Sequence, residues 1–275
     1  MPWVLRVAWA VLPLAMGPTL SDRLHEWDSS TRLAASAMLW VGWALVAIAT
    51  CVALPACLAV VAVGVIAAVV IGAVGLAPGA LVAVVAASAA ANAETVEWFV
   101  NGPAYANERR YPLRIPGPIL VLPVWLAVAA TVVGPAAAVM LVAGGDYIPG
   151  AVAAVVGGGA AVAGGRALYG LTQRWVVFVP AGLVLHDPMG LADPVLFERK
   201  LIESLHAAPA DTDSLDLTGA ALGLALEMVL TEKVPMVLAK GRRNAESGAS
   251  ARLLFTPTRP GRVLHEAAAR RIPVA

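Results

Sequence analysis

Long apolar stretches separated by short polar breaks dominate the first two thirds of the chain. Residues 33–93 carry no charged side chain, which is enough for nearly three membrane crossings at about 20 residues each. Pro55 and the Gly75–Gly79 stretch divide this run, because proline prefers to open or end a helix. The pattern therefore predicts crossings at 33–54, 56–76 and 79–98.

Three further apolar stretches complete the predicted membrane half. Uncharged runs on either side of Asp146 predict crossings at 118–143 and 147–168. Residues 2–20 are apolar apart from Arg6, whose long stem can reach the headgroups, and predict a first crossing. A cleaved signal peptide is the alternative for this segment, although Pro18 follows the only small residues at which cleavage would occur. Residues 1–170 are thus expected to form an α-helical polytopic membrane domain of about six transmembrane helices.

The remaining residues, 171–275, show shorter patterns that predict a small β-rich domain. Apolar runs at Trp175–Val179 and Leu183–Leu185, separated by turn residues, predict a hairpin. Large side chains at every second position from Leu222 to Leu230 predict a half-buried strand. Further strands are expected at Met236–Ala239 and Arg252–Thr256, joined by a polar loop from Lys240 to Ser250, and a closing helix at Pro260–Arg271.

One segment of this region fits two structures. Phe197, Leu201 and Leu205 share a helical face, whereas Leu201, Glu203 and Leu205 alternate as in a strand, so Asp193–Leu205 is ambiguous. A strand is preferred because its neighbours are strands. Since the charge density of residues 171–275 is ordinary, we expect this domain to fold without the membrane half.

Composition and charge agree with a membrane location. Apolar residues make up 60% of the chain and charged residues 13%, against roughly 45–50% and about 25% in globular proteins. The net charge of +1 gives no indication of nucleic-acid binding. Arg109, Arg110 and Arg114 make the loop Val100–Gly117 basic, which predicts that this loop and both termini are cytoplasmic in a multi-pass protein of the cell inner membrane.

Two carboxylates are the most informative polar residues of the membrane half. Glu94 and Glu97 lie three positions apart, so they share a helix face, and carboxylates in a bilayer often mark an ion path. They fall at the cytoplasmic end of the fourth crossing, where they can reach water or pair with Arg109 or Arg110. An interfacial anchor is the preferred interpretation, and a functional carboxylate is the alternative.

Other motifs give no indication of chemistry. The two cysteines and four histidines match no metal-ligand or nucleophile spacing, so neither a catalytic centre, a metal nor a cofactor is expected. Small residues four apart in the last crossing favour close packing between helices of one chain, with a homo-oligomer contact as the alternative. The pairs are Gly159 with Ala163, Ala160 with Gly164, and Ala161 with Gly165.

Two resemblances can be stated. The Thr172-Gln173-Arg174 lead-in, followed by a hairpin, several strands and a closing helix, resembles bacterial pleckstrin-homology-like (PH-like) domains that follow transmembrane helices. The whole chain is similar to uncharacterised integral membrane proteins of actinobacteria through Asn101-Gly102-Pro103, Glu108-Arg109-Arg110 and the sequence Val179–Pro188. The first resemblance implies a PH-like fold for residues 171–275, and the second implies no particular activity.

These observations favour a non-catalytic membrane scaffold. Such a protein would bind the lipid bilayer through its helices and a membrane or cytoplasmic protein through its β domain. A small transporter or transporter subunit that uses Glu94 and Glu97 is the alternative. A membrane enzyme comes third, for lack of a nucleophile, base or metal site.

Overall fold

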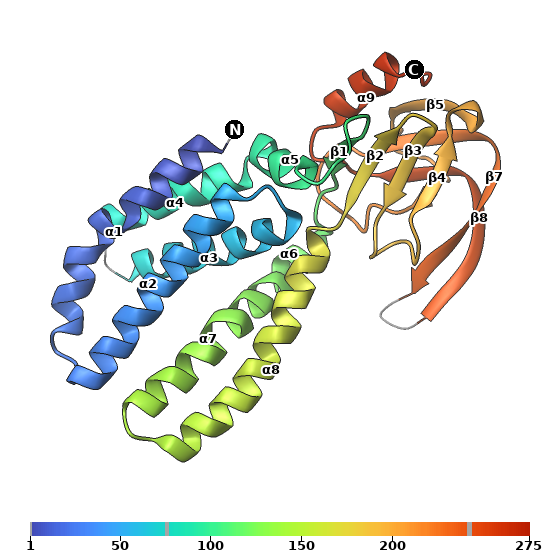
Figure 1. Ribbon diagram of the computed structural model, residues 1–275. Helices are drawn as coiled ribbons and strands as arrows, with labels where there is room; N and C mark the ends of the chain where they lie inside the picture. The colour runs from blue at the N-terminus through green and yellow to red at the C-terminus, as the bar shows by residue number, and fades with distance from the viewer. Residues whose placement is uncertain (1, 75–76, 241–243) are drawn as a thin grey trace. The chain divides into compact units, whose positions relative to one another are not determined.

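The computed structural model describes residues 2–74, 77–240 and 244–275, and the chain forms two compact units (Figure 1). The first unit contains Met1–Gly102 and Val124–Tyr169, and the second contains Pro103–Pro123 and Gly170–Ala275. The protein therefore has a helical part followed by a β-rich C-terminal part. Residues 103–123 belong to the second unit, although the sequence pattern predicts a membrane domain for all of residues 1–170.

Five helices in the described residues are long and apolar enough to cross a membrane. They agree with the crossings predicted at 2–20, 33–54, 56–76, 118–143 and 147–168, although the predicted end at residue 76 lies outside the described residues. Their bounds are Trp3–Leu24 (α1), Ser29–Cys51 (α2), Pro55–Ala73 (α3), Pro123–Ala143 (α7) and Tyr147–Leu171 (α8).

The fourth predicted crossing, at 79–98, is wrong as a continuous helix. It is divided into α4 (Ala77–Ala91) and α5 (Ala93–Asn101), whose axes differ by 57°. Asn92 lies at the break, and its side-chain oxygen accepts a hydrogen bond from the backbone N–H of Glu94 at 2.9 Å. Asparagine is a preferred residue for opening a helix in this way. The bent pair counts as a sixth span only if both helices cross together.

The predicted crossing at 118–143 also begins differently. Gly117–Val121 forms a separate short helix, α6, and the long helix α7 starts at Pro123. Proline has no backbone N–H and favours the first position of a helix. The chain therefore makes one short apolar turn before the span begins.

In the first unit, α1 and α2 are joined by a reciprocal pair of tryptophan hydrogen bonds. The indole Nε1 of Trp43 donates to the carbonyl of Trp9 at 2.9 Å, and the Nε1 of Trp9 donates to the carbonyl of Trp43 at 2.9 Å. Pro13 lies four residues after Trp9 and has no N–H to give that carbonyl. The indole of Trp43 thus replaces the donor that the proline removes.

Replacing Trp43 tests this compensation. W43F should destabilise the protein by about 1–3 kcal/mol, because the carbonyl of Trp9 is left without its donor in an apolar environment. W3F is the matched control, since Trp3 is 65% exposed. Thermal unfolding in detergent should show a lower midpoint for W43F only, and equal midpoints for the two variants would contradict the compensation.

The helices α7 and α8 pack through glycines. A Cβ added at Gly134 would lie 2.7 Å from the Cα of Gly157, and one at Gly164 would lie 2.6 Å from the carbonyl of Ala127. Small residues allow this close approach. The predicted small-residue pairs divide accordingly: Gly164 faces α7, whereas a Cβ at Gly159 or Gly165 would meet no described atom within 4 Å. Intramolecular packing is therefore confirmed for Gly164, and the homo-oligomer contact stays a prediction.

Within the described residues, the second unit contains two four-stranded sheets, the short helix α6 and a closing helix. The first sheet is antiparallel with the order β1-β2-β3-β4, and the second has the order β5-β7-β8-β6, with β6 parallel to β8. The bounds of the first sheet are Arg109–Pro112 (β1), Trp175–Val179 (β2), Gly182–His186 (β3) and Val195–Glu198 (β4). Those of the second are Ile202–Ala207 (β5), Leu215–Asp216 (β6), Leu226–Lys240 (β7) and Asn244–Phe255 (β8).

Strand β1 connects the two sheets, although its residues precede the α7–α8 hairpin in the chain. Figure 1 shows β1 in green among the yellow and orange strands of the tail. Its residues pair with β2 on one side, from Arg109 opposite Phe178 to Pro112 opposite Trp175. On the other side the segment beyond β8 pairs with the end of β1, through a bridge between Leu113 and Pro257 and backbone hydrogen bonds from Arg114 to Thr256 and from Thr258 to Pro112.

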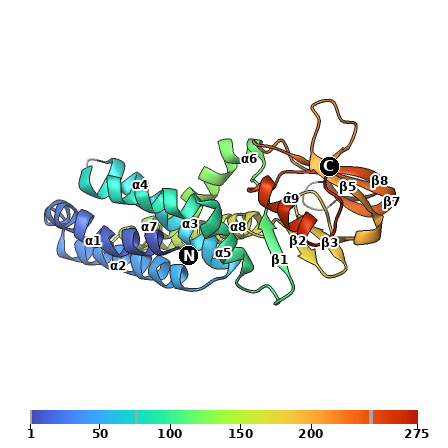
Figure 2. The same cartoon turned by 90° about the horizontal axis from the view of Figure 1, so that it is seen from above.

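The core of this unit lies between the two sheets and the helix α9 (Pro260–Ala269). Figure 2 shows α9 beside β1 and β2, and the hydroxyl of Tyr111 lies 3.4 Å from Glu266 of α9. The last residues add an edge to the second sheet, because the N–H of Leu205 donates to the carbonyl of Pro273. Fully buried core residues include Val176, Phe178, Leu183, Leu185, Phe197, Leu205, Leu226, Met228, Leu253, Phe255 and Val263.

Most strand predictions are confirmed and two are corrected. The hairpin of β2 and β3, the preference for strands within Asp193–Leu205 and the closing helix agree with the structure. The strand predicted from Leu222 begins only at Leu226, because Gly223 has a φ of +125° that extended backbone does not adopt. The predicted loop Lys240–Ser250 is wrong, since Asn244–Ser250 forms strand opposite β7; residues 241–243 lie outside the described residues.

The position of β1 revises the expectation that residues 171–275 fold alone. That fragment lacks Tyr111 and Leu113, which are only 3% and 6% exposed in the core. It also leaves β2 without a partner on one side. Burying such side chains contributes about 1.5–3 kcal/mol each, so the isolated fragment has an incomplete core and an open sheet edge.

Candidate functional site

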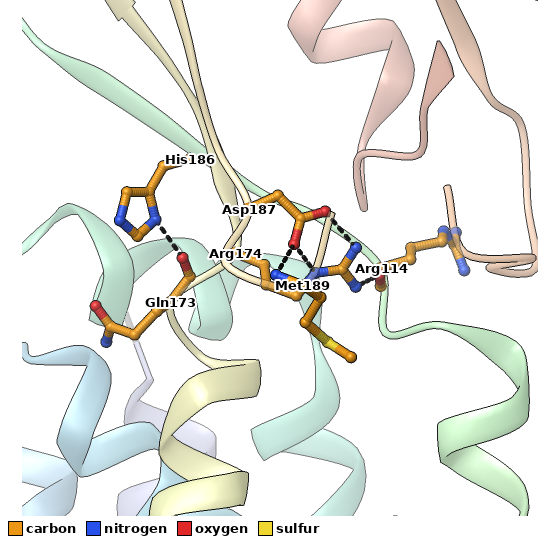
Figure 3. Close-up of polar contacts among 6 residues, drawn as sticks. All are labelled: Arg114, Gln173, Arg174, His186, Asp187 and Met189. Carbon is orange, nitrogen blue, oxygen red and sulfur yellow. Dashed lines mark hydrogen bonds and ion pairs between the residues drawn. The ribbon is translucent and has the colours of Figure 1, made fainter. Parts of the chain in front are cut away.

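A buried ion pair joins the start of β2 to the end of β3. The guanidinium of Arg174 donates to both carboxylate oxygens of Asp187, with Nε to Oδ1 at 2.6 Å and Nη2 to Oδ2 at 2.7 Å (Figure 3). Their side chains are only 2% and 1% exposed. A two-pronged pair of this kind combines strength with a fixed geometry. We call Arg174 and Asp187 the clamp pair.

The clamp pair also binds backbone on both sides. The Nη1 of Arg174 donates to the carbonyl of Arg114 at 2.7 Å, and Asp187 Oδ1 accepts from the N–H of Met189 at 3.1 Å. The N–H of Leu113 donates to the carbonyl of Arg174 at 3.0 Å. Arg114 and Arg174 lie on either side of the α6–α8 insertion, so the clamp pair joins the chain before the insertion to the chain after it.

A stack of side chains lies on the sheet beside the clamp pair. The guanidinium carbon of Arg110 lies 5.4 Å from the centre of the Trp175 ring, and the rings of Trp175 and His186 stack at 4.9 Å. A cation over an indole face is attracted by the ring electrons. His186 Nδ1 donates to the carbonyl of Gln173 at 2.6 Å, which fixes the imidazole ring (Figure 3).

The four candidate residues belong to different units of the structure. Glu94 and Glu97 lie on α5 in the first unit, where Glu94 is exposed and Glu97 is only 5% exposed. Although Glu94 and Glu97 lie three positions apart on one helix, one carboxylate is therefore exposed and the other is buried. Arg109 and Arg110 lie on β1 in the second unit, and Arg110 Nη2 is 3.2 Å from Glu108. The two arginines are thus strand residues and do not belong to an open loop.

The clamp pair was missed as a site, although the sequence contains a signal for it. Arg174 directly precedes the first apolar run of the predicted hairpin, and Asp187 follows the second run after one intervening residue. Because Trp175 pairs with His186, continuing the antiparallel register one step places 174 opposite 187. Opposite charges at such positions favour an ion pair. What the sequence did not indicate is that Arg114 completes the arrangement.

The clamp pair predicts a clear mutational result. R174M should destabilise the second unit by about 3–5 kcal/mol, because Asp187 remains as a buried charge without its cation. The double variant R174M/D187L should recover most of this loss, since no charge then remains buried. Hydrogen exchange of peptides that cover β2 and β3 measures the effect.

K200M is the matched control for this prediction. Lys200 forms an exposed ion pair with Glu198 at 2.8 Å, and exposed pairs contribute little. Exchange in K200M should equal that of the wild type. If R174M exchanges as slowly as K200M, the clamp pair does not hold the strands.

A second buried carboxylate holds the loop before β6. Glu227 of β7 is 2% exposed, and its Oε1 accepts from Thr212 Oγ1 at 2.8 Å and from Ser214 Oγ. His206 Nε2 lies 3.9 Å from Oε2. Burial alone would raise the pKa of Glu227, but the hydrogen bonds from Ser214 and Thr212, helped by the charges of His206 and Arg252, hold this pKa below its usual value.

This lowered pKa gives a pH dependence. A carboxyl whose pKa is lower in the folded state contributes stability above its unfolded pKa of about 4.3. This contribution is lost as the pH falls from there through the lower pKa of the folded state. The hydrogen-exchange protection factors of residues 206–214, which correct for the slower intrinsic exchange in acid, should therefore fall in acid in the wild type and fall less in E227Q. E203Q, which changes an exposed carboxylate of the neighbouring strand, should behave like the wild type. An identical acid response in E227Q and the wild type would refute this role.

Comparisons with protein-family models, curated proteins and solved structures gave no match for this chain. Within the described residues, no group of three or more His, Cys, Asp or Glu side chains is arranged to hold a metal ion. The geometry alone therefore defines what the site can do. Its polar groups bind strand to strand and loop to strand.

Proposed function

We propose that this protein is a non-catalytic membrane scaffold whose β unit binds a protein partner. One observation supports the proposal most directly: the β unit is attached to the α7–α8 hairpin through two neighbouring strands. The chain leaves the unit after β1 and α6 and returns just before β2, and the clamp pair joins the segments next to these strands. A recognition domain held at a membrane by two chain connections has less freedom than one on a single linker.

The proposal also includes a fold class and a cellular location for the β unit. Two sheets, a closing helix and a central core agree with a PH-like assignment for the β-rich part. We propose that both termini and the segment 100–117 are cytoplasmic in the inner membrane, because Arg109, Arg110 and Arg114 favour retention on that side. The β unit would then meet a cytoplasmic protein or the cytoplasmic face of a membrane protein.

Photocrosslinking in native membranes tests the scaffold proposal. A photoreactive residue is placed at Leu196 on the edge strand β4, which is 44% exposed, or at Trp40 on α2 as the control. The proposal predicts a discrete protein adduct from Leu196 that Trp40 does not form. The same adduct should be lost in R174M at equal membrane abundance. Two outcomes would contradict the proposal. One is that Leu196 gives no protein adduct, and the other is that the adduct persists in R174M although its β unit is unfolded.

A transporter or transporter subunit is the second candidate, and one feature favours it. Glu97 is a buried carboxylate on α5, directly after the 57° bend between α4 and α5. Interrupted helices and buried carboxylates are typical of ion and substrate paths in transporters. Glu94, on the same helix but exposed, supplies a matched control.

Single glutamine variants separate the two candidates. A coupled pathway through Glu97 requires a carboxylate, since an amide can neither release a proton nor balance a cation. The transporter candidate predicts that E97Q reaches normal membrane abundance but no longer rescues the cellular phenotype of a deletion, whereas E94Q does. Full rescue by E97Q would exclude this pathway and leave the scaffold proposal in place.

A further inference from the structure

An uncharged loop of the second unit carries two exposed leucines. Residues 217–225, which we call the Leu222 loop, connect β6 to β7 and contain no charged side chain. Leu222 is 73% exposed and Leu224 is 52% exposed. Exposed apolar side chains that are grouped in one segment indicate an interaction surface. The question is which surface they meet.

The Leu222 loop is bound to the chain that enters the membrane hairpin. The N–H of Gly117 donates to the carbonyl of Ala220 at 3.2 Å. A Cβ added at Gly219 would lie 3.1 Å from Pro116, and one at Gly223 would lie 2.8 Å from Arg114 Nε. Residues 114–117 and the Leu222 loop therefore pack together within the second unit.

The contact with Gly117 places the loop close to the start of a candidate span. Gly117 opens α6, and α7 begins six residues later at Pro123. With about 1.5 Å of rise per helical residue and at most 3.8 Å per extended link, Ala220 lies within roughly 15–20 Å of that first residue. The polar interface of a bilayer and the adjoining acyl boundary extend over a similar depth.

The surface next to the Leu222 loop also carries exposed apolar side chains. In α6 and the residue after it, Leu120, Val121 and Leu122 are 41%, 78% and 57% exposed. Arg114 is exposed beside Gly223. A cation next to apolar side chains suits a bilayer interface, where the long stem stays in apolar surroundings and the charged end reaches the headgroups.

Several backbone N–H donors of the loop already have hydrogen-bond partners within the loop and at Asp216. Its turn binds its own donors: Thr218 N–H to Asp216 Oδ1 at 2.7 Å, Ala220 N–H to Thr218 Oγ1 at 3.2 Å, and Ala221 N–H to the carbonyl of Thr218 at 3.2 Å. Backbone donors that already have partners cost less to remove from water. Three N–H donors of the turn that precedes Leu222 thus already have partners.

From these observations we propose that the Leu222 loop inserts Leu222 and Leu224 into the lipid interface beside α6. The occupant of this surface is the bilayer itself. The β unit then has a third attachment to the membrane, in addition to its two chain connections. The inference goes beyond the proposed function, because it applies equally to a scaffold and to a transporter.

A fluorescent probe tests the insertion in the full chain. Cys51 and Cys57 are replaced by alanine, and a single cysteine at Leu222 carries an environment-sensitive nitrobenzoxadiazole label. The protein is reconstituted into phosphatidylcholine–phosphatidylglycerol vesicles that contain lipids with a nitroxide high on the acyl chain. A label at Leu196, which is exposed on β4, is the matched control. Both sites are exposed, so labelling leaves the core unchanged.

The proposal predicts opposite behaviour at the two sites. The Leu222 label should emit at shorter wavelength, be quenched at least twofold more by the nitroxide lipids than the Leu196 label, and be protected from aqueous iodide. Equal iodide quenching at both sites would overturn the proposal. Protection from iodide without quenching by the nitroxide lipids would overturn it as well, because a protein surface or a second copy of the chain would then cover the loop.

Discussion

Strand β1 has to pair with β2 and with the segment after β8 for the second unit to have a closed core, and this constraint orders the rest of the molecule. It forces the chain to leave the β unit after α6 and to return at the end of α8, so the hairpin of α7 and α8 is an insertion between two paired strands. The same constraint explains the clamp pair. Arg174 holds the strand that returns against the carbonyl of Arg114 on the strand that leaves.

In both units, side chains form hydrogen bonds with polar groups that would otherwise lack a partner. In the first unit the indole of Trp43 donates to the carbonyl that Pro13 leaves without its helical donor, and Arg6 Nε donates to the carbonyl of Thr50 in the last turn of α2. In the second unit, hydroxyl groups satisfy the buried Glu227. Buried polar groups need such partners, and the requirement is strict where no water is present. These contacts therefore connect segments that are distant in the sequence.

Whether an element could be predicted from the sequence depends on how far apart in the chain its stabilising contacts lie. Five spans, the β2–β3 hairpin and α9 could be predicted because local apolar runs, prolines and turn residues encode them. The bend at Asn92 depends on one capping side chain, and the start of β7 at Leu226 depends on the backbone angle of Gly223. The role of β1 could not be predicted, because Arg109–Pro112 looks like a polar loop until its partners, more than 60 residues away, are known.

The pairing of β1 is tested most directly by comparing two soluble fragments. One contains residues 170–275, and the other joins residues 103–116 to the same segment through a short Gly/Ser linker that replaces the insertion. Circular dichroism and urea unfolding measure whether each fragment folds. The account predicts a mainly β spectrum and a cooperative transition for the joined fragment only. Equal cooperative unfolding of residues 170–275 alone would show that β1 is not required for the core.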